Sequence, residues 1–531
     1  MKSNPKVLVA DEISQEGLTI LNEGLDLTYK PTITQNELLA TIKDYDGLLV
    51  RSRAKVDDSI INASTRLKVI GRAGVGVDNI DVTAATQKGI LVLNSPEGNT
   101  ASASEHTVAL MMSLARKIPQ ADKSVKDGKW TRSKFLGTEL FNKTLGIIGF
   151  GKIGRRVANM ANAIGMRVII YDPLIDNDSI KHLNITLVDL EQIWKLADFI
   201  TIHTPKTKQT TNLINHSVLN RLKDGVCIIN TSRGGIIDER ALALSIKNGK
   251  VKGAALDVFE EEPLAIDSPL LEFNDQIILT PHLGASTAEA QLNVSLDLAC
   301  QLKEYLLTGI SKSPVNLPYL NPEVLKILSP YIKLAQSMAS IAASFINSEI
   351  REIQISVSGN LAKYDTISLS AATIKGALNS TVEGLNFINA FYVANEHGIN
   401  IRDSKFFHTE NDFNELNIVL NGKSGFISID GTVLNQDQPV ITKINEFNVN
   451  LAPAKYMLFT RHNDQPGMVA KVALILGENQ KNISSMTVSR KNLGEEAMMV
   501  IELDENLDAD LLNKISCLNG ILQVSFVNLY D

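Results

Sequence analysis

The residues best suited to chemistry are an arginine, a histidine and a run of glutamates, each placed just after an apolar run typical of a β-strand. His282 stands in "LTPHLGAST", Arg233 in "INTSRGGIID" and the glutamates in "DVFEEEPL". In an open parallel sheet, ligands bind beyond the carboxyl ends of the strands, so these groups are expected to meet there. An imidazole can take a proton from an alcohol near neutral pH, and a guanidinium can hold a carboxylate bidentately. The pattern predicts acid–base chemistry on a substrate that carries a carboxylate.

Each of these residues also has a simpler interpretation when it is considered alone. An arginine in a loop commonly caps backbone carbonyls, and many histidines are surface groups. The run "EEE" is compatible with a solvated charged loop. The spacing does not choose which of Glu260, Glu261 and Glu262 orients the imidazole.

A glycine-spaced turn, "GIIGFGKIGR", predicts a dinucleotide site. Gly149, Gly151 and Gly154 follow an expected strand and open an expected helix, so the backbone can approach a pyrophosphate at the helix N-terminus. Asp172 ends the next expected strand, 18 residues after Gly154, where a carboxylate bonds a ribose 2'-hydroxyl and repels a 2'-phosphate. A turn-initiating aspartate before Pro173 is the plainer interpretation. Together the glycines and the aspartate predict NAD as the cofactor, in preference to NADP.

The elements that must position these residues form two α/β series. Strands are expected at 6–10, 47–51, 67–71 and 90–94, with amphipathic helices between them, and a second series of six apolar runs begins at "TLGIIGF". After "PHLGAST" a single helix, about 286–308, is too isolated to be a domain. It is expected to return to the first unit, so that the second is inserted between two parts of one lobe. The expected boundaries are 1–98 and 286–313 for the substrate lobe and 99–285 for the nucleotide domain.

Two further segments follow a Pro- and Asn-rich linker. Residues 320–452 show mixed strand and helix signals and no motif that can be tied to chemistry. Residues 455–531 follow the order β-α-β-β-α-β, which predicts a compact ferredoxin-like unit.

Composition excludes several classes of protein. The 531 residues are 44% hydrophobic and 21% charged, with a net charge of -7 and no Lys/Arg run longer than two, so no nucleic-acid partner is expected. Three separated cysteines predict neither a disulfide framework nor a metal site. No apolar run reaches the length of a membrane span or of a signal peptide, and a cytoplasmic protein without membrane partners is expected.

Six stretches together resemble the D-isomer-specific 2-hydroxyacid dehydrogenases: "GRAGVGVDNID", "SPEGNTASASEHT", "LGIIGFGKIG", "INTSRGGIID", "AALDVFEEEP" and "TPHLGAST". The resemblance covers about 310 residues, and the C-terminal segments extend it to the long form of the family. It implies a Rossmann-type domain inserted in a split flavodoxin-like substrate domain, then an α+β intervening domain and a regulatory ferredoxin-like ACT domain.

The resemblance also implies a mechanism. The family's arginine matches Arg233, its glutamate precedes a proline and therefore matches Glu262, and its histidine matches His282. His282 would take the hydroxyl proton while hydride passes to the nicotinamide, Glu262 would hold the imidazole, and Arg233 would bind the substrate carboxylate. The implied activity is NAD-dependent oxidation of 3-phospho-D-glycerate to 3-phosphooxypyruvate, the first step of L-serine biosynthesis.

For the cofactor, the resemblance implies contacts beyond the glycine turn and Asp172. The residues are Lys152, Ile153, Thr204, Thr231, Ser232, Arg233, Asp257, His282, Leu283, Gly284 and Ala285. The chain departs from the family at Val75, where related enzymes often carry a hydroxyl residue near the nicotinamide.

Three arginines favour a substrate with a phosphate. Arg51, Ser52 and Arg53 end one strand of the first lobe and Arg72 ends another, where a dianionic group would be bound. Ordinary surface charge is the weaker interpretation. The rivals are another member of the family, which reduces glyoxylate, hydroxypyruvate or 2-oxoglutarate, and a non-catalytic NAD-binding regulator.

The C-terminal unit predicts a regulatory site for L-serine. His462 and Asp464 lie where a strand turns through "DQPG" into a helix, and Asn482 begins the next strand. In ACT domains these positions bind small amino acids across a domain pair, and the family implies a tetramer. The alternative is a dimerisation module that has lost its ligand site.

Overall fold

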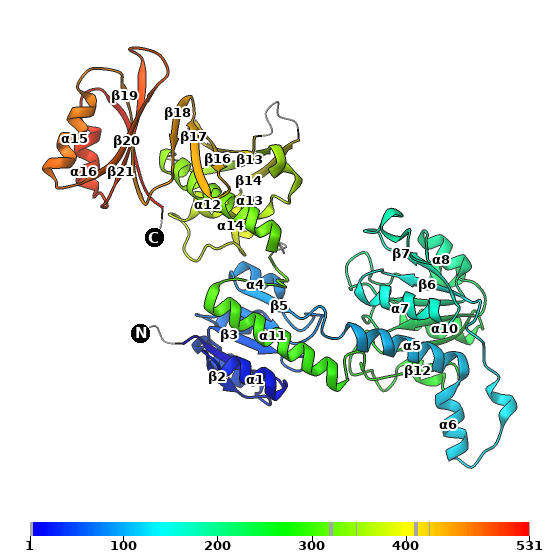
Figure 1. Ribbon diagram of the computed structural model, residues 1–531. Coiled ribbons are helices and arrows are strands. Elements are labelled where there is room, and N and C mark those ends of the chain that lie inside the picture. Colours follow the sequence, from blue (N-terminus) through cyan, green and yellow to red (C-terminus); the bar gives the residue numbers. More distant parts are fainter. Residues whose placement is uncertain (1–3, 318–321, 347, 408–412, 424, 530–531) are drawn as a thin grey trace.

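The computed structural model describes residues 4–317, 322–346, 348–407, 413–423 and 425–529, arranged around four sheets (Figure 1). The start of the third segment, expected at 320, and part of the linker before it therefore lie outside the described residues. None of the helices in the described part is long and apolar enough to cross a bilayer. Within the same part, His, Cys, Asp and Glu side chains form no cluster suited to a metal ion.

The first lobe is a five-stranded parallel sheet in the order β2-β1-β3-β4-β5. Its strands are β1 (Lys6–Val9), β2 (Asp26–Tyr29), β3 (Gly47–Val50), β4 (Val69–Arg72) and β5 (Leu91–Asn94), and its helices are α1 (Gln15–Asn22), α2 (Gln35–Thr41), α3 (Asp58–Ala63) and α4 (Val82–Gln87). Each helix begins after a Ser, Thr or Asp whose side chain accepts a backbone N–H of the first turn. The sequence analysis expected four strands and missed β2, because this edge strand is only partly buried and lacks an apolar run.

The helix α11 (Ala288–Thr308) follows the inserted domain in the chain and packs on the first lobe, as expected (Figure 1). Its Val294, Leu298 and Leu302 lie in one core with Val7 and Val69 of the sheet. At Gly71 of β4 a Cβ would lie 3.2 Å from Leu298, so the glycine lets the helix approach the strand closely.

The inserted domain contains a seven-stranded parallel sheet in the order β12-β11-β10-β9-β6-β7-β8. The strands are β6 (Thr144–Ile148), β7 (Arg167–Tyr171), β8 (Thr186–Leu187), β9 (Phe199–Ile202), β10 (Val226–Asn230), β11 (Val251–Leu256) and β12 (Ile277–Leu279). The helices are α5 (Thr100–Arg116), α6 (Ile118–Lys126), α7 (Lys152–Ala163), α8 (Leu190–Leu196), α9 (His216–Arg221) and α10 (Glu239–Lys247). Six strands were expected; the seventh, β8, is a two-residue edge strand, too short to leave an apolar pattern.

The third sheet has the order β14-β13-β15-β16-β17-β18, antiparallel except for the β13–β14 pair. It contains β13 (Ile350–Ser358), β14 (Asn400–Phe406), β15 (Glu415–Gly422), β16 (Gly425–Leu434), β17 (Gln438–Ile444) and β18 (Phe447–Leu451), packed with α12 (Pro322–Phe345), α13 (Ile367–Leu378) and α14 (Ala390–Glu396). Short 3-10 helices complete the chain at Ile42–Asp44, Arg132–Phe135, Asp178–Ile180, Pro269–Glu272 and Gly359–Lys363.

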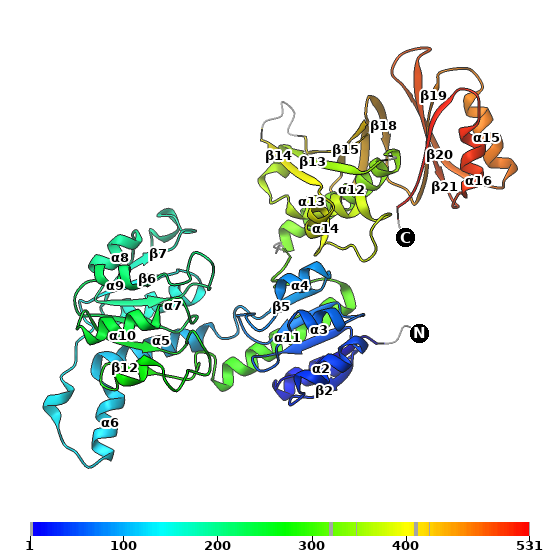
Figure 2. The ribbon, with the colours of Figure 1, turned by 180° about the vertical axis from the view of Figure 1, so that it is seen from behind.

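The fourth sheet is antiparallel, in the order β20-β21-β19-β22. Its strands are β19 (Tyr456–Asn463), β20 (Ile483–Arg490), β21 (Glu496–Leu503) and β22 (Ile521–Asn528), and α15 (Met468–Glu478) and α16 (Ala509–Ser516) cover one face. Met457, Phe459 and Met498, on the other face, belong to the core of the third domain. The ferredoxin-like order was therefore predicted correctly, and the helix-free face packs against its neighbour (Figure 2).

Candidate active site

His282 and Glu262 form a hydrogen-bonded pair beyond the ends of β12 and β11. His282 Nδ1 lies 2.7 Å from Glu262 Oε2, and the two side chains are 49% and 38% exposed. The other oxygen of Glu262 accepts the Phe259 N–H at 3.1 Å. Glu260 instead contacts Glu239 at the start of α10. Spacing alone did not distinguish Glu262 from its two neighbours. The fold brings Glu262 to the imidazole.

The Glu262 carboxylate is held in its charged form. Partial burial would raise its pKa, but hydrogen bonds from His282 and from the Phe259 N–H outweigh burial, so the pKa of Glu262 lies below its ordinary value. An ionised carboxylate on Nδ1 holds the ring in place and stabilises an imidazolium. Because Nδ1 is occupied, Nε2 is the nitrogen left for a substrate hydroxyl.

A buried aspartate holds the loop that carries His282. Asp257 is fully buried and accepts hydrogen bonds from Thr280 Oγ1 at 2.6 Å and from the N–H groups of Leu283 and Gly284 at 2.7 and 2.8 Å. Burial would raise the pKa of Asp257, but His106, Thr280 and Leu283 lower it on balance. These contacts show Asp257 positioning the loop; its expected contact with the cofactor stays a prediction.

The sequence analysis missed His106. This residue of α5 places Nε2 3.1 Å from Asp257 Oδ1 and 3.3 Å from Thr280 Oγ1. Its position in the helical stretch "SEHTVAL" offers no signal of a partner, because Asp257 lies 151 positions later in the chain.

Arg233 extends from the end of β10 to the first lobe. Its Nε lies 2.9 Å from Asp78 Oδ2, and one Nη donates to the Ser232 carbonyl at 2.7 Å. A Cβ at Gly76 would lie 1.7 Å from the other Nη, so only glycine leaves room for the guanidinium there. The sequence analysis also missed Asp78 and Gly76 as parts of the site. Both lie in "GRAGVGVDNID", more than 150 positions before Arg233, and nothing in that stretch indicates that they are close to Arg233 in space.

Arg72 lies near Arg233 as an incompletely paired cation. Burial, followed by the positive charge of Arg233, lowers its pKa to about 10, and the charge of Arg51 acts in the same direction. Its Nε is buried and has no hydrogen-bond partner. Three guanidinium groups close enough to act on one another, those of Arg72, Arg233 and Arg51, suit an anion with more than one negative charge.

Arg53 is directed elsewhere. Its Nε pairs with Asp11 at 3.1 Å, and one Nη donates to the Ile33 carbonyl at 2.9 Å, so the guanidinium ties strand ends together. The same Asp11 accepts the Arg51 N–H at 2.6 Å, and Ser52 is exposed. Of the four expected phosphate ligands, Arg72 and Arg51 are the better placed, and Arg53 is already occupied.

The glycine turn has the shape a pyrophosphate requires. Gly149 has φ 93°, and a Cβ there would lie 2.5 Å from the His203 carbonyl. A Cβ at Gly154 would lie 2.2 Å from the Gly149 carbonyl, whereas nothing approaches within 4 Å at Gly151, which caps α7. The first and third glycines therefore permit packing, and the second leaves open space for a ligand at the helix N-terminus.

The other expected cofactor residues surround this turn. Asp172 accepts the Phe150 N–H at 2.7 Å and the Leu174 N–H at 2.9 Å, which fixes its carboxylate. Thr204 Oγ1 is buried without a partner, an unsatisfied group of the kind a bound ligand would complete. Lys152 pairs with Glu97 of the connection between the lobes. Ile153 lies in the first turn of α7, Thr231 and Ser232 follow β10, and Leu283, Gly284 and Ala285 lie in the turn that follows β12. The residues present fit a dinucleotide.

The three expected regulatory residues do not meet within one chain. His462 is the last residue but one of β19 and is buried, and Asp464, just past the strand, accepts the Gly494 N–H at 3.1 Å. Asn482 precedes β20 and contacts Asp504, at the other end of the sheet, because Ile483 pairs with Leu503 and Leu503 with Tyr456. A shared ligand would therefore need two copies of the domain.

Comparison with known proteins agrees with this geometry. Residues 108–284 match the model of the D-isomer specific 2-hydroxyacid dehydrogenase NAD binding domain, and residues 327–445 match the D-3-phosphoglycerate dehydrogenase intervening domain. The chain is 45% identical over 526 residues to D-3-phosphoglycerate dehydrogenase of Synechocystis sp., covering 99% of this chain and 95% of that one. It is 40% identical to the enzyme of the same name from Archaeoglobus fulgidus, covering 99% and 100%.

Solved structures match the first two domains. D-lactate dehydrogenase from Aquifex aeolicus, complexed with NAD and lactic acid, is 30% identical with a TM-score of 0.53, over 59% of this chain and 99% of that one. A glyoxylate reductase from Paecilomyes thermophila is 28% identical with a TM-score of 0.56, over 59% and 99%.

Proposed function

The chain belongs to the D-3-phosphoglycerate dehydrogenases of the D-isomer-specific 2-hydroxyacid dehydrogenase family, and we propose that it acts through the three groups gathered at the cleft. It is an NAD-dependent oxidoreductase that converts 3-phospho-D-glycerate into 3-phosphooxypyruvate, the first step of L-serine biosynthesis. The 2.7 Å pair of His282 and Glu262, which follow β12 and β11, together with Arg233 after the neighbouring strand β10, carries the assignment of roles.

Each side chain has one task in the mechanism. His282 Nε2 removes the proton of the C2 hydroxyl, and Glu262 stabilises the imidazolium that results. Arg233 binds the substrate carboxylate chiefly through the Nη that has no partner among the described residues, since Asp78 holds its Nε and the Ser232 carbonyl accepts a hydrogen bond from the other Nη. The glycine turn and Asp172 would hold NAD, which would supply the acceptor for the hydride from C2. We assign the phosphate to Arg72 and Arg51.

A substrate comparison tests the assignment. The full chain with NAD should oxidise 3-phosphoglycerate with a kcat/KM well above those for D-glycerate and D-lactate, because neither of these carries a phosphate for Arg72. A preference for glycerate or lactate would instead support a 2-keto acid reductase, and no turnover would support a non-catalytic regulator.

Cofactor choice is expected to depend on Asp172. Asp172→Ala should narrow the preference for NAD over NADP by about tenfold, roughly 1.4 kcal/mol, because the fixed carboxylate no longer repels the 2'-phosphate. Ratios of kcat/KM for the two cofactors measure this effect. Asp176→Ala, an acid four residues away that bonds Ser179, is the matched control. An unchanged ratio would place the ribose contact elsewhere.

An exposed arm, formed by α6 and the segment that follows it as far as Phe141, supports a homo-oligomer, which is expected to be a tetramer. The helix α6 has no buried residue and projects from the nucleotide domain (Figures 1 and 2). The segment after it exposes Trp130, Leu136 and Phe141 by 80%, 83% and 64%. Several large apolar side chains exposed in one segment mark a contact with a partner, whereas a single exposed residue such as Leu174 does not.

The arm is expected to hold subunits together. Trp130→Glu should shift the sedimentation coefficient of the full chain toward smaller species, because a charge would replace a ring in the interface. Leu174→Glu, at a position 91% exposed on the same domain, should leave it unchanged. Wild-type protein that sediments as a monomer would contradict the proposal.

L-serine is proposed as an inhibitor that binds between two C-terminal domains. Inhibition by serine at the C-terminal domain requires contacts that connect this domain to the active-site lobes. The third domain provides such contacts, because Asn386 Nδ2 donates to the Gly89 carbonyl at 2.8 Å and Ile388 lies in the core of the first lobe. Coupling energies of about 1–3 kcal/mol correspond to roughly 5- to 150-fold changes in affinity.

The serine proposal is tested by titration against the full chain and against a chain ending near Asn316. Inhibition is expected in the first and not in the second, whose own turnover without serine serves as the control. Inhibition that survives truncation, or a full chain insensitive to serine, would refute the site at His462, Asp464 and Asn482.

We propose a substrate domain at 1–98 and 286–313, a nucleotide domain at 99–285, an intervening domain at 320–452 and an ACT domain at 455–531. The described part of the chain contains free thiols at Cys227, Cys300 and Cys517, which support the proposed cytoplasmic location.

A further inference from the structure

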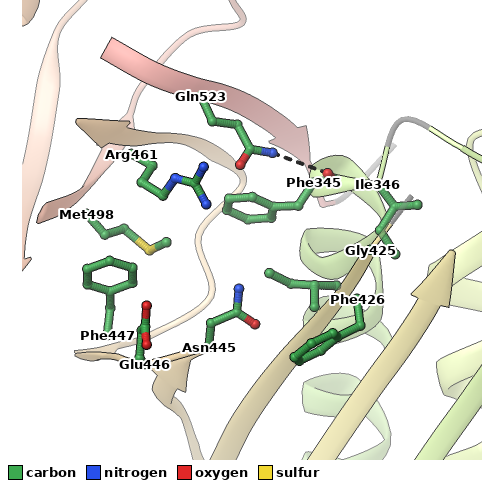
Figure 3. A pocket seen from close by; sticks show the side chains of 11 residues that line it. Phe345, Ile346, Gly425, Phe426, Asn445, Glu446, Phe447, Arg461, Met498 and Gln523 are labelled. Atoms are coloured by element: carbon green, nitrogen blue, oxygen red, sulfur yellow. Dashed lines mark hydrogen bonds between the residues drawn. The ribbon is translucent and has the colours of Figure 1, made fainter. Parts of the chain in front are cut away.

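A cavity of about 300 Å³ lies between the third domain and the C-terminal domain (Figure 3). One wall comes from the end of α12, the start of β16 and the turn from β17 to β18. The other wall comes from the helix-free face of the fourth sheet, through Arg461, Met498 and Gln523. The volume is at the lower end of the range for small-molecule sites.

The cavity is separate from the proposed serine site. Arg461 and His462 are neighbours on β19, so their side chains point to opposite faces of the sheet. His462 is on the face covered by helices, while Arg461 points into the cavity beside Phe345 and Met498 (Figure 3).

The donors of the cavity suit a carboxylate. Arg461 Nε is buried and makes no hydrogen bond, although Glu496 Oε2 lies 3.4 Å away. The Arg461 charge already faces Glu496 and its side chain is 41% exposed, so an anionic ligand would add the hydrogen bond that Nε lacks. Asn445 uses its Oδ1 to accept the Ser428 N–H at 2.9 Å, so its amide NH2 is the group left to face a ligand.

The acceptors suit an ammonium group. Gln523 donates its Nε2 to the Phe345 carbonyl at 3.2 Å, which leaves its amide oxygen toward the cavity (Figure 3). Glu446 adds a carboxylate to the cavity lining. Its Oε2 also accepts a hydrogen bond from the Lys491 ammonium group at 2.6 Å, and this ion pair connects the two domains. A positive and a negative side chain therefore line the same small space.

The smaller part of the cavity surface is apolar. Phe447 and Met498 are only 3% and 2% exposed, and Phe345 packs edge-on against Phe459 with ring centroids 5.4 Å apart. Rings and a thioether accommodate an apolar or aromatic group without requiring hydrogen bonds.

We propose that this cavity binds an α-amino acid with an apolar side chain. Arg461 binds its carboxylate, Glu446 its ammonium group, and Phe345, Phe447 and Met498 enclose its side chain. The ligand bridges two domains and stabilises their present arrangement, because its two charged groups contact one domain each.

Calorimetric titration of the full chain tests the proposal with L-phenylalanine, 3-phenylpropionate and L-serine. L-phenylalanine should bind, and 3-phenylpropionate should bind more weakly because it lacks the ammonium group. Arg461→Gln should weaken both by roughly 10- to 100-fold, the range for a lost hydrogen bond to a charged group. Glu446→Gln should weaken L-phenylalanine alone, which keeps the test decisive even if the arginine variant folds poorly.

Arg402→Gln is the matched control, since Arg402 is also a strand arginine paired with a glutamate, at 2.7 Å from Glu352 and remote from the cavity. It should leave every affinity unchanged. Affinity for L-serine should be unaffected by Arg461→Gln, so this result and the serine proposal can fail independently. Absence of L-phenylalanine binding at about 10 mM, or equal affinities of wild type and Arg461→Gln, would overturn the proposal.

Discussion

Replacing His282 by alanine is expected to lower kcat by about 10²- to 10⁴-fold, the usual contribution of a general acid–base residue. The imidazole is held by Glu262 at 2.7 Å and is half exposed at the cleft, so it can reach a substrate hydroxyl. Alanine removes the proton acceptor while Asp257 continues to hold the loop through the Leu283 and Gly284 N–H groups. Affinity for NADH should therefore remain close to that of the wild type.

Steady-state kinetics and NADH fluorescence titration together measure this result. His216→Ala is the matched control, because His216 begins the surface helix α9 and contacts only Asn220 among the described side chains. The control should retain full turnover. A His282→Ala enzyme with near-normal kcat would show that another group takes the proton.

Replacing Arg233 by glutamine is expected to lower kcat/KM for 3-phosphoglycerate by about 10²- to 10³-fold, as loss of a preorganised charged donor commonly does. Glutamine retains much of the length but not the charge or the two Nη groups that hold a carboxylate. Asp78→Asn should have a smaller effect of the same kind, because Asp78 acts on the substrate only through the 2.9 Å contact with Arg233 Nε.

A double-mutant cycle checks the dependence of Asp78 on Arg233. If Asp78 only positions the arginine, Asp78→Asn should cost little once Arg233 is glutamine, so the two effects should not add. Arg221→Gln, a surface arginine paired with Glu191 on the same domain, is the control. Additive effects would give Asp78 a role of its own, and an unchanged kcat/KM in Arg233→Gln would remove the arginine from the site.

Much of the architecture could be predicted from local patterns. Central strands such as β3 and β10 are buried along their whole length, so their apolar runs are visible in the sequence. The two strands that were missed, β2 and β8, lie at sheet edges, where partial exposure or short length removes that signal. The inserted domain was predicted because α11 had no partner nearby in the sequence, and α11 does pack in the core of the first lobe.

The sequence by itself determined which residues have the chemical character of the site: the glycine turn, Asp172, Arg233 and His282 are each recognisable from residue type and from their place after an apolar run. Only the tertiary structure decided how these residues are paired. It placed Asp78 on Arg233 and His106 on Asp257 and turned Arg53 toward Asp11, and it brought to the imidazole Glu262, which spacing did not distinguish and only the family resemblance implied. The physical reason is that strand patterns are local, whereas these pairs join strand ends and lobes far apart in the chain, and a hydrogen bond depends on distances of a few tenths of an ångström.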